Sequence, residues 1–339
     1  MFEERITDPT HVDRATIDAI LREGRQPIVQ FSKPGYTLDL LGRINQLCVE
    51  FGERLEVRFY GFYQHGFDAA DLLHLPDVCR LTLDCLETIV NPQQIAMLPR
   101  LSALSFGVYR FGDAAFLERL ELGRLTELTL GENQARNLDL APLRQGRRLR
   151  TLWLHGHARN IEAVAELPAL AELTLGGFPN SRNLAFLCGL SSLRSLFLFG
   201  GSRATIDELS HPELEKLMFR HVRGLESAGP LARFPRLQRL HVEDQLKLRT
   251  LDVAGLPLRS LVLSNCKTLA RIEGLARLDR LAEMRVMRTN LDLDALARGE
   301  WPATLRVLAL YAGSRKRDAQ LRALLDQRGY LDWSRRGAD

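Results

Sequence analysis

A short phrase, Leu-x-x-Leu-x-Leu with apolar replacements, recurs eleven times between residues 78 and 310 of this 339-residue chain. The first apolar residues of successive phrases are 21 to 24 residues apart. They are Val78, Leu101, Leu125, Leu149, Leu170, Leu193, Leu214, Leu237, Leu258, Leu281 and Leu305. A period of this length means that each unit forms the same small element and buries its apolar face by stacking on its neighbours. No other feature constrains the fold as strongly.

The phrase and its period resemble those of leucine-rich repeat proteins, in which each repeat adds one short strand to a curved parallel sheet. Apolar residues also recur at every third position after a strand, as at Ile161, Val164, Leu167 and Leu170. This spacing suits a 3₁₀ turn, in which side chains i and i+3 eclipse. We therefore predict an α/β fold: a leucine-rich repeat solenoid, or horseshoe, with a concave parallel sheet and 3₁₀ or short helices on the convex side.

The short repeats are similar to those of the regulatory subunit of protein phosphatase 1. In that class the ninth position of a repeat usually carries Asn, whose amide bonds the backbone of neighbouring turns. Only Asn133 keeps this residue, Cys266 is a permitted variant, and other repeats place side chains such as Tyr109 and Phe178 there. The resemblance therefore indicates a divergent member of the class with no assigned subfamily.

The repeat divides the chain into three expected regions. Residues 1–53 lack the phrase and read as a capping segment, with a strand at 27–31 and a helix around 38–51. Residues 54–312 form the solenoid of about 11 to 12 repeats, its first strand at 55–60. Residues 313–339 supply a C-terminal cap helix and a disordered tail. A cap is needed at each end because an open solenoid would expose its leucines.

Composition excludes several classes of protein. The net charge of +4 arises from 46 basic and 42 acidic residues, so no strong field favours nucleic acid or a membrane surface. No leader-like segment and no apolar run of membrane-spanning length are present, and five cysteines form no evident disulfide framework. We expect a cytoplasmic monomer, and the preference for arginine over lysine indicates a GC-rich bacterial source.

The variable positions of the phrase predict the binding site. If its fourth and sixth residues point inward, the third, fifth and seventh lie on the concave face. That face is small and neutral at Gly107, Gly131 and Gly176, which lets a partner approach the backbone closely. Exposed aromatic residues beside charged ones are typical of protein-binding surfaces. The predicted partner-binding residues are Trp153, His155, Phe197, Phe199, Met218, Arg220, Arg239, His241, Glu243 and Arg285.

Two alternatives compete with this interpretation. The aromatic rings could pack on one another, or be covered by the N-terminal segment or by a second copy of the chain. Arginines just before or inside the strands, such as Arg236, Arg259 and Arg280, could also form a ridge that tracks phosphates. We favour a solvated edge there, because glutamates alternate with the arginines and no aromatic residues are interleaved.

Motifs of catalysis are missing from the sequence. It has no phosphate-binding glycine loop, nucleophile elbow, zinc-protease helix or paired Cys-x-x-Cys. His155 and His157 could chelate a metal, but the second falls where the chain leaves the strand and no matched ligand accompanies them. We therefore predict no catalytic residue, no metal and no cofactor.

These features favour a non-enzymatic protein that binds a protein partner on its concave face. The architecture is similar to that of ribonuclease inhibitor, which suggests a bacterial immunity protein or inhibitor that neutralises a toxin. One alternative is an intracellular regulator or scaffold of an endogenous enzyme such as a phosphatase, as the repeat type implies. An effector delivered into a host cell is a weaker alternative.

Overall fold

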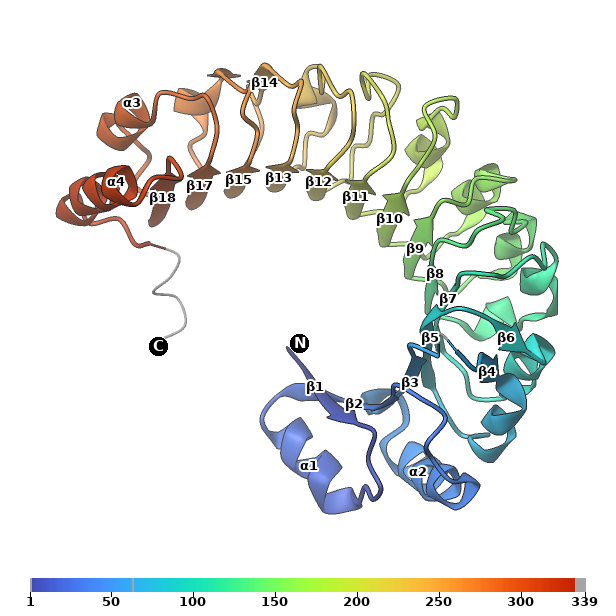
Figure 1. Ribbon diagram of the computed structural model, residues 1–339. Helices are drawn as coiled ribbons and strands as arrows, with labels where there is room; N and C mark the ends of the chain where they lie inside the picture. The colour runs from blue at the N-terminus through green and yellow to red at the C-terminus, as the bar shows by residue number, and fades with distance from the viewer. Residues whose placement is uncertain (1, 63, 333–339) are drawn as a thin grey trace. The chain divides into compact units, whose positions relative to one another are not determined.

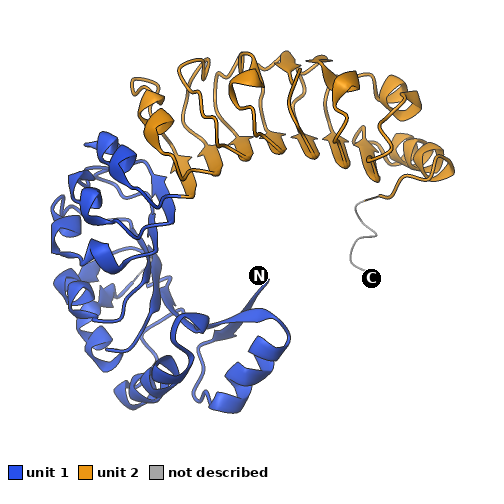
Figure 2. Cartoon of the chain, turned by 180° about the vertical axis from the view of Figure 1, so that it is seen from behind, with its two compact units in different colours: residues 1–170 blue, residues 171–339 orange. Residues whose placement is uncertain are grey.

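A computed structural model describes residues 2–62 and 64–332 (Figure 1). The protein is a leucine-rich repeat solenoid, as predicted: each repeat gives one strand to a parallel sheet and returns through 3₁₀ turns or a short helix. The chain forms two compact units, residues 1–170 and 171–339 (Figure 2). The boundaries expected from the repeat, at 53/54 and 312/313, stay a prediction.

The sheet of the first unit follows the chain order, so every connection leads to the adjacent strand. Its seven strands are β1 (Phe2–Thr7), β2 (Arg25–Phe31), β3 (Glu56–Tyr60), β5 (Arg80–Leu86), β7 (Ala103–Val108), β8 (Glu127–Leu130) and β9 (Thr151–His155). Val57 pairs with Leu81, and Leu81 with Leu104, so the strand at 55–60 continues the repeat in register, as expected.

The N-terminal segment is more ordered than its sequence indicated. Residues 2–7, for which the sequence predicted no strand, form β1, which pairs in parallel with β2. Helix α1 (Arg14–Arg22) follows, and the Asp13 side chain caps it by accepting from the backbone N–H of Thr16. Helix α2 (Leu38–Phe51) has the bounds expected from its apolar spacing, and Thr37 caps it.

The outer layer of the first unit is made of short elements, as the three-residue spacing predicted. Strands β4 (Phe67–Asp68) and β6 (Ile89–Val90) pair there in parallel. The remaining pieces are 3₁₀ helices: η1 (Gly52–Arg54), η2 (Ala69–His74), η3 (Pro92–Met97), η4 (Phe116–Arg119), η5 (Leu122–Arg124), η6 (Ala141–Gln145) and η7 (Ile161–Glu166).

The second unit repeats this plan. Its sheet consists of β10 (Glu172–Gly176), β11 (Ser195–Phe199), β12 (Lys216–Arg220), β13 (Arg239–Glu243), β15 (Ser260–Ser264), β17 (Glu283–Met287) and β18 (Val307–Tyr311). Its outer layer contains η8 (Ala185–Gly189), η9 (Leu231–Arg233), η10 (Leu275–Arg277), helix α3 (Leu293–Arg298) and the paired strands β14 (Thr250–Asp252) and β16 (Arg271–Glu273).

Helix α4 (Arg315–Gln327) covers the last strand, and its Leu321 and Leu325 are buried. The chain after the helix is held to β18, because the Tyr311 hydroxyl donates to the Asp332 carboxylate at 2.6 Å. The helix predicted from residues 318–325 is therefore present at the end of the repeats. The tail at 334–339, which we expected to be disordered, lies outside the described residues.

The interior is built by the leucines of the phrase. On β11, Leu196 and Leu198 are buried while the residues between them are partly exposed, and most of the other strands alternate in the same way. Each inward leucine contacts equivalent residues of the neighbouring repeats, so the core is a continuous stack.

The ninth position of the repeat is polar more often than we inferred. His157 and Gln245 occupy it and are fully buried, like Asn133. His157 Nε2 lies 2.9 Å from the carbonyl oxygen of Gly131 and donates to it, since a carbonyl can only accept. Gln245 donates to the Glu243 carbonyl at 2.7 Å. Counting only Asn and Cys was too narrow, because His and Gln also supply a buried hydrogen-bonding group at this position, whereas the repeat of Phe178 buries an apolar ring there.

The eighth position of the repeat turns the chain away from the sheet through a left-handed backbone conformation. Gly156 and Gly200 have positive φ there, and so do non-glycine residues such as Asp244 and Asn265. Asp and Asn tolerate this region better than most side chains. Where this turn occurs, it places the seventh side chain of the phrase at the end of its strand.

Candidate functional site

The outward side chains of the sheet form what we call the variable face, namely the third, fifth and seventh residues of each phrase. Parallel pairing in register aligns these positions in rows that run across the strands. In the first unit one row contains Arg58, Thr82, Ser105, Thr129 and Trp153 on successive strands. The character of the face therefore changes from strand to strand.

Charged residues on β3, β5 and β8 form an ion-pair cluster: Glu56, Arg58, Arg80, Asp84 and Glu127. The Arg58 guanidinium donates to both carboxylate oxygens of Asp84, at 2.8 and 2.9 Å, and to Gln30 Oε1 at 3.0 Å. It also lies 4.4 Å from the centroid of the Tyr60 ring. A paired fork of this kind fixes both the position and the orientation of the side chain.

Arg80 forms the second fork of the cluster, donating to Glu127 at 2.9 and 2.7 Å. These bonds lower the pKa of Glu127, although partial burial opposes them. Burial raises the pKa of Glu56, and a 2.8 Å hydrogen bond from the Thr82 hydroxyl opposes that shift. The cluster satisfies its own charges, so it offers a partner few free groups.

Next to the cluster is an apolar depression of about 600 Å³, which we call the aromatic hollow. Tyr109 and Trp153 flank it, and their exposed fractions of 52% and 42% are high for residues of this size. It is lined by Asp84, Cys85, Leu86, Glu87, Ser105, Phe106, Gly107, Tyr109, Thr129, Gly131, Glu132, Trp153 and His155. Strands β5, β7, β8 and β9 all contribute to it.

Two glycines form part of the floor of the hollow. A Cβ atom on Gly131 would lie 3.0 Å from the Gly107 Cα, which is backbone and cannot give way easily. A Cβ on Gly107 would meet Asp84 at an ordinary 3.6 Å. The backbones are in close contact at these two glycines, and the absence of side chains there leaves space between Tyr109 and Trp153.

Tyr109 was not among the predicted binding residues. We placed it at the ninth position of its repeat, which is usually turned inward, whereas its ring is exposed here. Its backbone N–H donates to the Leu86 carbonyl at 2.8 Å, so the chain is still held to the preceding repeat at this point. The sequence alone did not distinguish it, because Phe178 occupies the same position of its repeat and is buried.

The two histidines beside the hollow have different environments. His155 lines it, with Nε2 3.6 Å from a Glu132 carboxylate oxygen, whereas His157 is buried in the repeat interior. Burial lowers the pKa of both. Their side chains therefore lie in separate environments. Among residues 2–62 and 64–332, no group of three or more His, Cys, Asp or Glu side chains is placed to hold a metal ion.

In the second unit, parallel pairing aligns Phe197 with Met218 and Met218 with His241. The rings of Phe197 and Phe199 lie 6.0 Å apart at 47° and are each partly buried. The alternative that rings pack on one another therefore applies to this pair in part. In the row of Phe199, the aromatic residue is followed by the charged residues Arg220 and Glu243.

The charged residues predicted for the second unit are close to one another. Arg220 Nε and His241 Nε2 lie 3.7 and 3.5 Å from the same Glu243 carboxylate oxygen. Burial lowers the pKa of His241, although Glu243 opposes the shift. Arg285 forms an ion pair with Glu283 on its own strand, and Arg239 is exposed on β13. All ten predicted residues lie on the variable face, and their part in binding stays a prediction.

Comparison of the structure with solved structures finds other leucine-rich repeat proteins. A chain of the Toll–Spätzle complex of Drosophila has a TM-score of 0.50 and 16% sequence identity, over 94% of this chain and 48% of that one. An internalin of Listeria monocytogenes has a TM-score of 0.46 and 15% identity, over 98% and 86% of the two chains. A leucine-rich repeat protein of Leptospira interrogans gives 0.46 and 15%, over 96% and 93%. At this level of identity the likeness concerns the fold.

No protein-family model matches the sequence, and no curated protein matches it either. In the part of the chain that the structure describes, no helix has the length and apolar character to cross a lipid bilayer. The functional inference therefore depends on the geometry of the variable face.

Proposed function

We propose that this protein binds a protein partner through its variable face, with the aromatic hollow of the first unit as the main anchor point. The observation that carries this proposal is the exposure of Tyr109 and Trp153 on either side of a depression with a glycine floor. Large rings that remain exposed beside a depression gain most from burial by a partner, because they lose little conformational entropy on binding.

The chemistry of the hollow favours binding over catalysis. Three carboxylates line it, and each lies against an arginine: Asp84 pairs with Arg58, Glu87 with Arg110, and Glu132 with Arg136. A general acid or base must be free to exchange a proton with substrate, whereas each of these carboxylates is engaged by a guanidinium group. We therefore infer a binding protein without an active site.

We further propose that the bound partner is a toxin that the protein inhibits, in the manner of an immunity protein. A face with several anchor points can cover a large area of an enzyme, and the variable face carries candidate anchors in each unit. The alternative, a regulator or scaffold of an endogenous enzyme, uses the same face. The two roles differ in what capture does: inhibition abolishes the partner's activity, whereas a scaffold leaves it active.

The test replaces one ring at a time in the full-length protein. Trp153→Ala is expected to weaken capture of the partner by about 2 kcal/mol, or roughly thirtyfold in Kd, as for a binding hot spot. Phe197→Ala and Phe199→Ala test separately whether the second unit contributes to the affinity for the partner. Calorimetry with the purified partner gives the affinities, and circular dichroism checks that each variant is folded.

Met97 supplies the matched control. It is the more exposed residue, at 68%, but it lies on η3 in the outer layer and not on the variable face. Met97→Ala should therefore leave capture unchanged. Equal affinity of the Trp153→Ala variant and the native protein would refute the hollow as anchor, and loss of capture by Met97→Ala would move the binding site to the outer layer.

A further inference from the structure

One repeat of the second unit has one residue fewer than its neighbours just before the first leucine of the phrase. In most repeats a residue three positions before the first leucine of the phrase is apolar, as in Phe234-Pro-Arg-Leu237 and Leu278-Asp-Arg-Leu281. Between them the pattern is Leu256-Pro-Leu258, with one residue fewer. A one-residue deletion in a stacked repeat leaves the flanking repeats in place and must be absorbed locally.

The backbone shows how the deletion is absorbed. In the flanking repeats the turn closes at the first leucine, with Leu237 N–H donating to Phe234 O at 2.9 Å and Leu281 N–H to Leu278 O at 3.4 Å. In the short repeat the last such bond runs from Leu256 N–H to Val253 O at 3.3 Å, which is equivalent to the bond from Phe234 N–H to Leu231 O at 2.9 Å, and no turn bond closes at the described residue Leu258. The last turn is therefore displaced to a point two residues before Leu258.

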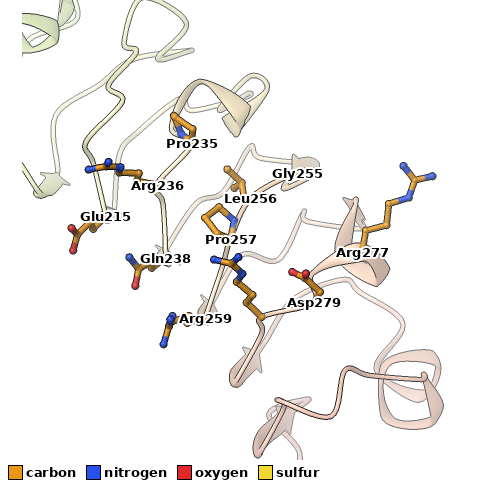
Figure 3. Close-up of a pocket in the computed structure, with 11 residues that line it drawn as sticks. Glu215, Pro235, Arg236, Gln238, Gly255, Leu256, Pro257, Arg259, Arg277 and Asp279 are labelled. Carbon is orange, nitrogen blue, oxygen red and sulfur yellow. The ribbon is translucent and has the colours of Figure 1, made fainter.

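This displaced turn leaves a depression of about 650 Å³ between the two flanking turns, which we call the arginine hollow. Figure 3 shows Leu256 and Pro257 between Arg236 and Asp279, with Arg277 extending away from them. It is lined by Glu215, Pro235, Arg236, Gln238, Gly255, Leu256, Pro257, Arg259, Arg277, Asp279 and Arg280. Repeats two apart are separated by roughly 10 Å at the usual strand spacing, which is wide enough for one extended peptide.

The arginines at the strand starts differ in their partners. Arg100 pairs with Asp77 and Arg194 with Glu213, whereas Arg124 donates to the Pro99 carbonyl. Among the residues that the structure describes, the guanidinium groups of Arg259 and Arg280 have no ion pair and no hydrogen bond. Arg236 pairs with Glu213. Four arginines and two carboxylates line the hollow, so it carries an excess of positive charge.

We propose that the arginine hollow binds an acidic protein segment, whose carboxylates pair with Arg259 and Arg280. Guanidinium groups bind carboxylates through two parallel hydrogen bonds. The apolar lining supplied by Pro235, Leu256 and Pro257 suits the aliphatic part of glutamate side chains. A nucleic acid fits less well, because Glu215 and Asp279 interrupt the positive surface and no aromatic side chain lines the hollow for base stacking.

This site is separate from the aromatic hollow and goes beyond the proposed function. The test measures binding of a fluorescein-labelled octaglutamate peptide to the full-length protein by fluorescence anisotropy at low ionic strength. Arg259→Gln/Arg280→Gln is expected to weaken binding about tenfold or more, since two charged hydrogen-bond donors are lost. An octaglutamine peptide should not bind.

Arg306→Gln and Arg249→Gln provide matched controls. Arg306 occupies the same register position as Arg259, directly after the first leucine of its phrase, but it does not line the hollow. The controls should bind octaglutamate as the native protein does. Equal weakening by the controls would overturn the proposal in favour of general charge attraction, and tighter binding of a 12-nucleotide single strand than of octaglutamate would overturn it in favour of nucleic acid.

A second variant tests the origin of the hollow without removing any charge. Inserting one serine after Pro257 restores the three-residue spacing of the neighbouring repeats and moves the turn back to the strand. Octaglutamate binding should fall at least as far as in the double arginine variant, while the circular dichroism spectrum and the urea midpoint stay close to native values. Native affinity in a folded insertion variant would contradict the role of the displaced turn.

Discussion

Two neighbouring parts of the variable face in the first unit use their side chains in opposite ways. In the ion-pair cluster, Arg58 and Arg80 bind carboxylates of other strands through paired forks. In the aromatic hollow, Tyr109 and Trp153 remain exposed above two glycines. The strands of both parts bury alternate apolar residues, but the pairing of β5 with β7 shifts register between Leu83 and Leu86, beside the hollow.

The difference shows that polar and apolar residues on a repeat face have separate roles. Charged side chains on nearby strands can reach one another and form ion pairs within the molecule, so they stabilise the sheet. The exposed rings of the aromatic hollow are not covered by neighbouring side chains, so only a partner can bury them further. Substitutions in the ion-pair cluster should therefore reduce the stability of the protein, whereas substitutions in the aromatic hollow should reduce its affinity for the partner.

The largest expected effect separates the two parts through Arg58. Its side chain is only 15% exposed and contacts Asp84 and Gln30, so Arg58→Ala leaves partly buried groups without a partner. We expect the free energy of unfolding to fall by about 3 kcal/mol, near the lower end for broken buried pairs. Urea denaturation measures the change.

Arg58→Lys is the matched variant, because it keeps the charge but not the fork, and it should lose less stability than Arg58→Ala. Partner binding by either folded variant should stay within a factor of about three of the native value, or less than 1 kcal/mol. A loss of affinity as large as that of Trp153→Ala would break the distinction between the two parts of the face.

The floor of the hollow gives the next effect in size. Gly131→Ala forces a Cβ against the Gly107 Cα at 3.0 Å, and we expect it to cost about 1–2 kcal/mol of stability by overpacking. Gly107→Ala meets only an ordinary contact and should be nearly neutral. Thermal denaturation compares the two.

Both substitutions narrow the hollow, so both should weaken partner binding even though only one destabilises the protein. The two variants therefore distinguish the effect of a smaller hollow on binding from the effect of a lower stability. Full affinity in the Gly107→Ala variant would mean that the partner does not reach the floor.

The smallest effect concerns pH. Burial lowers the pKa of His157, so the unfolded chain takes up a proton more readily than the folded one. Stability from this group is complete above the unfolded value of about 6.5 and is lost as the pH falls below it. His157→Gln should reduce the decline in urea midpoint between pH 8 and pH 5.5. A decline as steep as in the native protein would assign the effect to the other histidines.

Particular residues show how far the sequence could predict this structure. The spacing of Leu149, Leu152 and Leu154 specifies both a strand and the face on which Trp153 lies, because side chains alternate along a strand. Tyr109 was missed because one repeat turns its ninth residue outward. Strand β1 was missed because its side chains are largely exposed and carry no alternating apolar pattern, whereas its backbone pairs fully with β2.

The sequence by itself determined the repeat, the parallel sheet, the 3₁₀ turns and the composition of the variable face, since these follow from the period and from the alternation of side chains. Only the tertiary structure decided which of those side chains pair with one another and which remain exposed. Arg58 and Asp84 are 26 residues apart, and the aromatic hollow draws on four strands. Contacts between repeats depend on register and on the distance between backbones, and no single repeat encodes either.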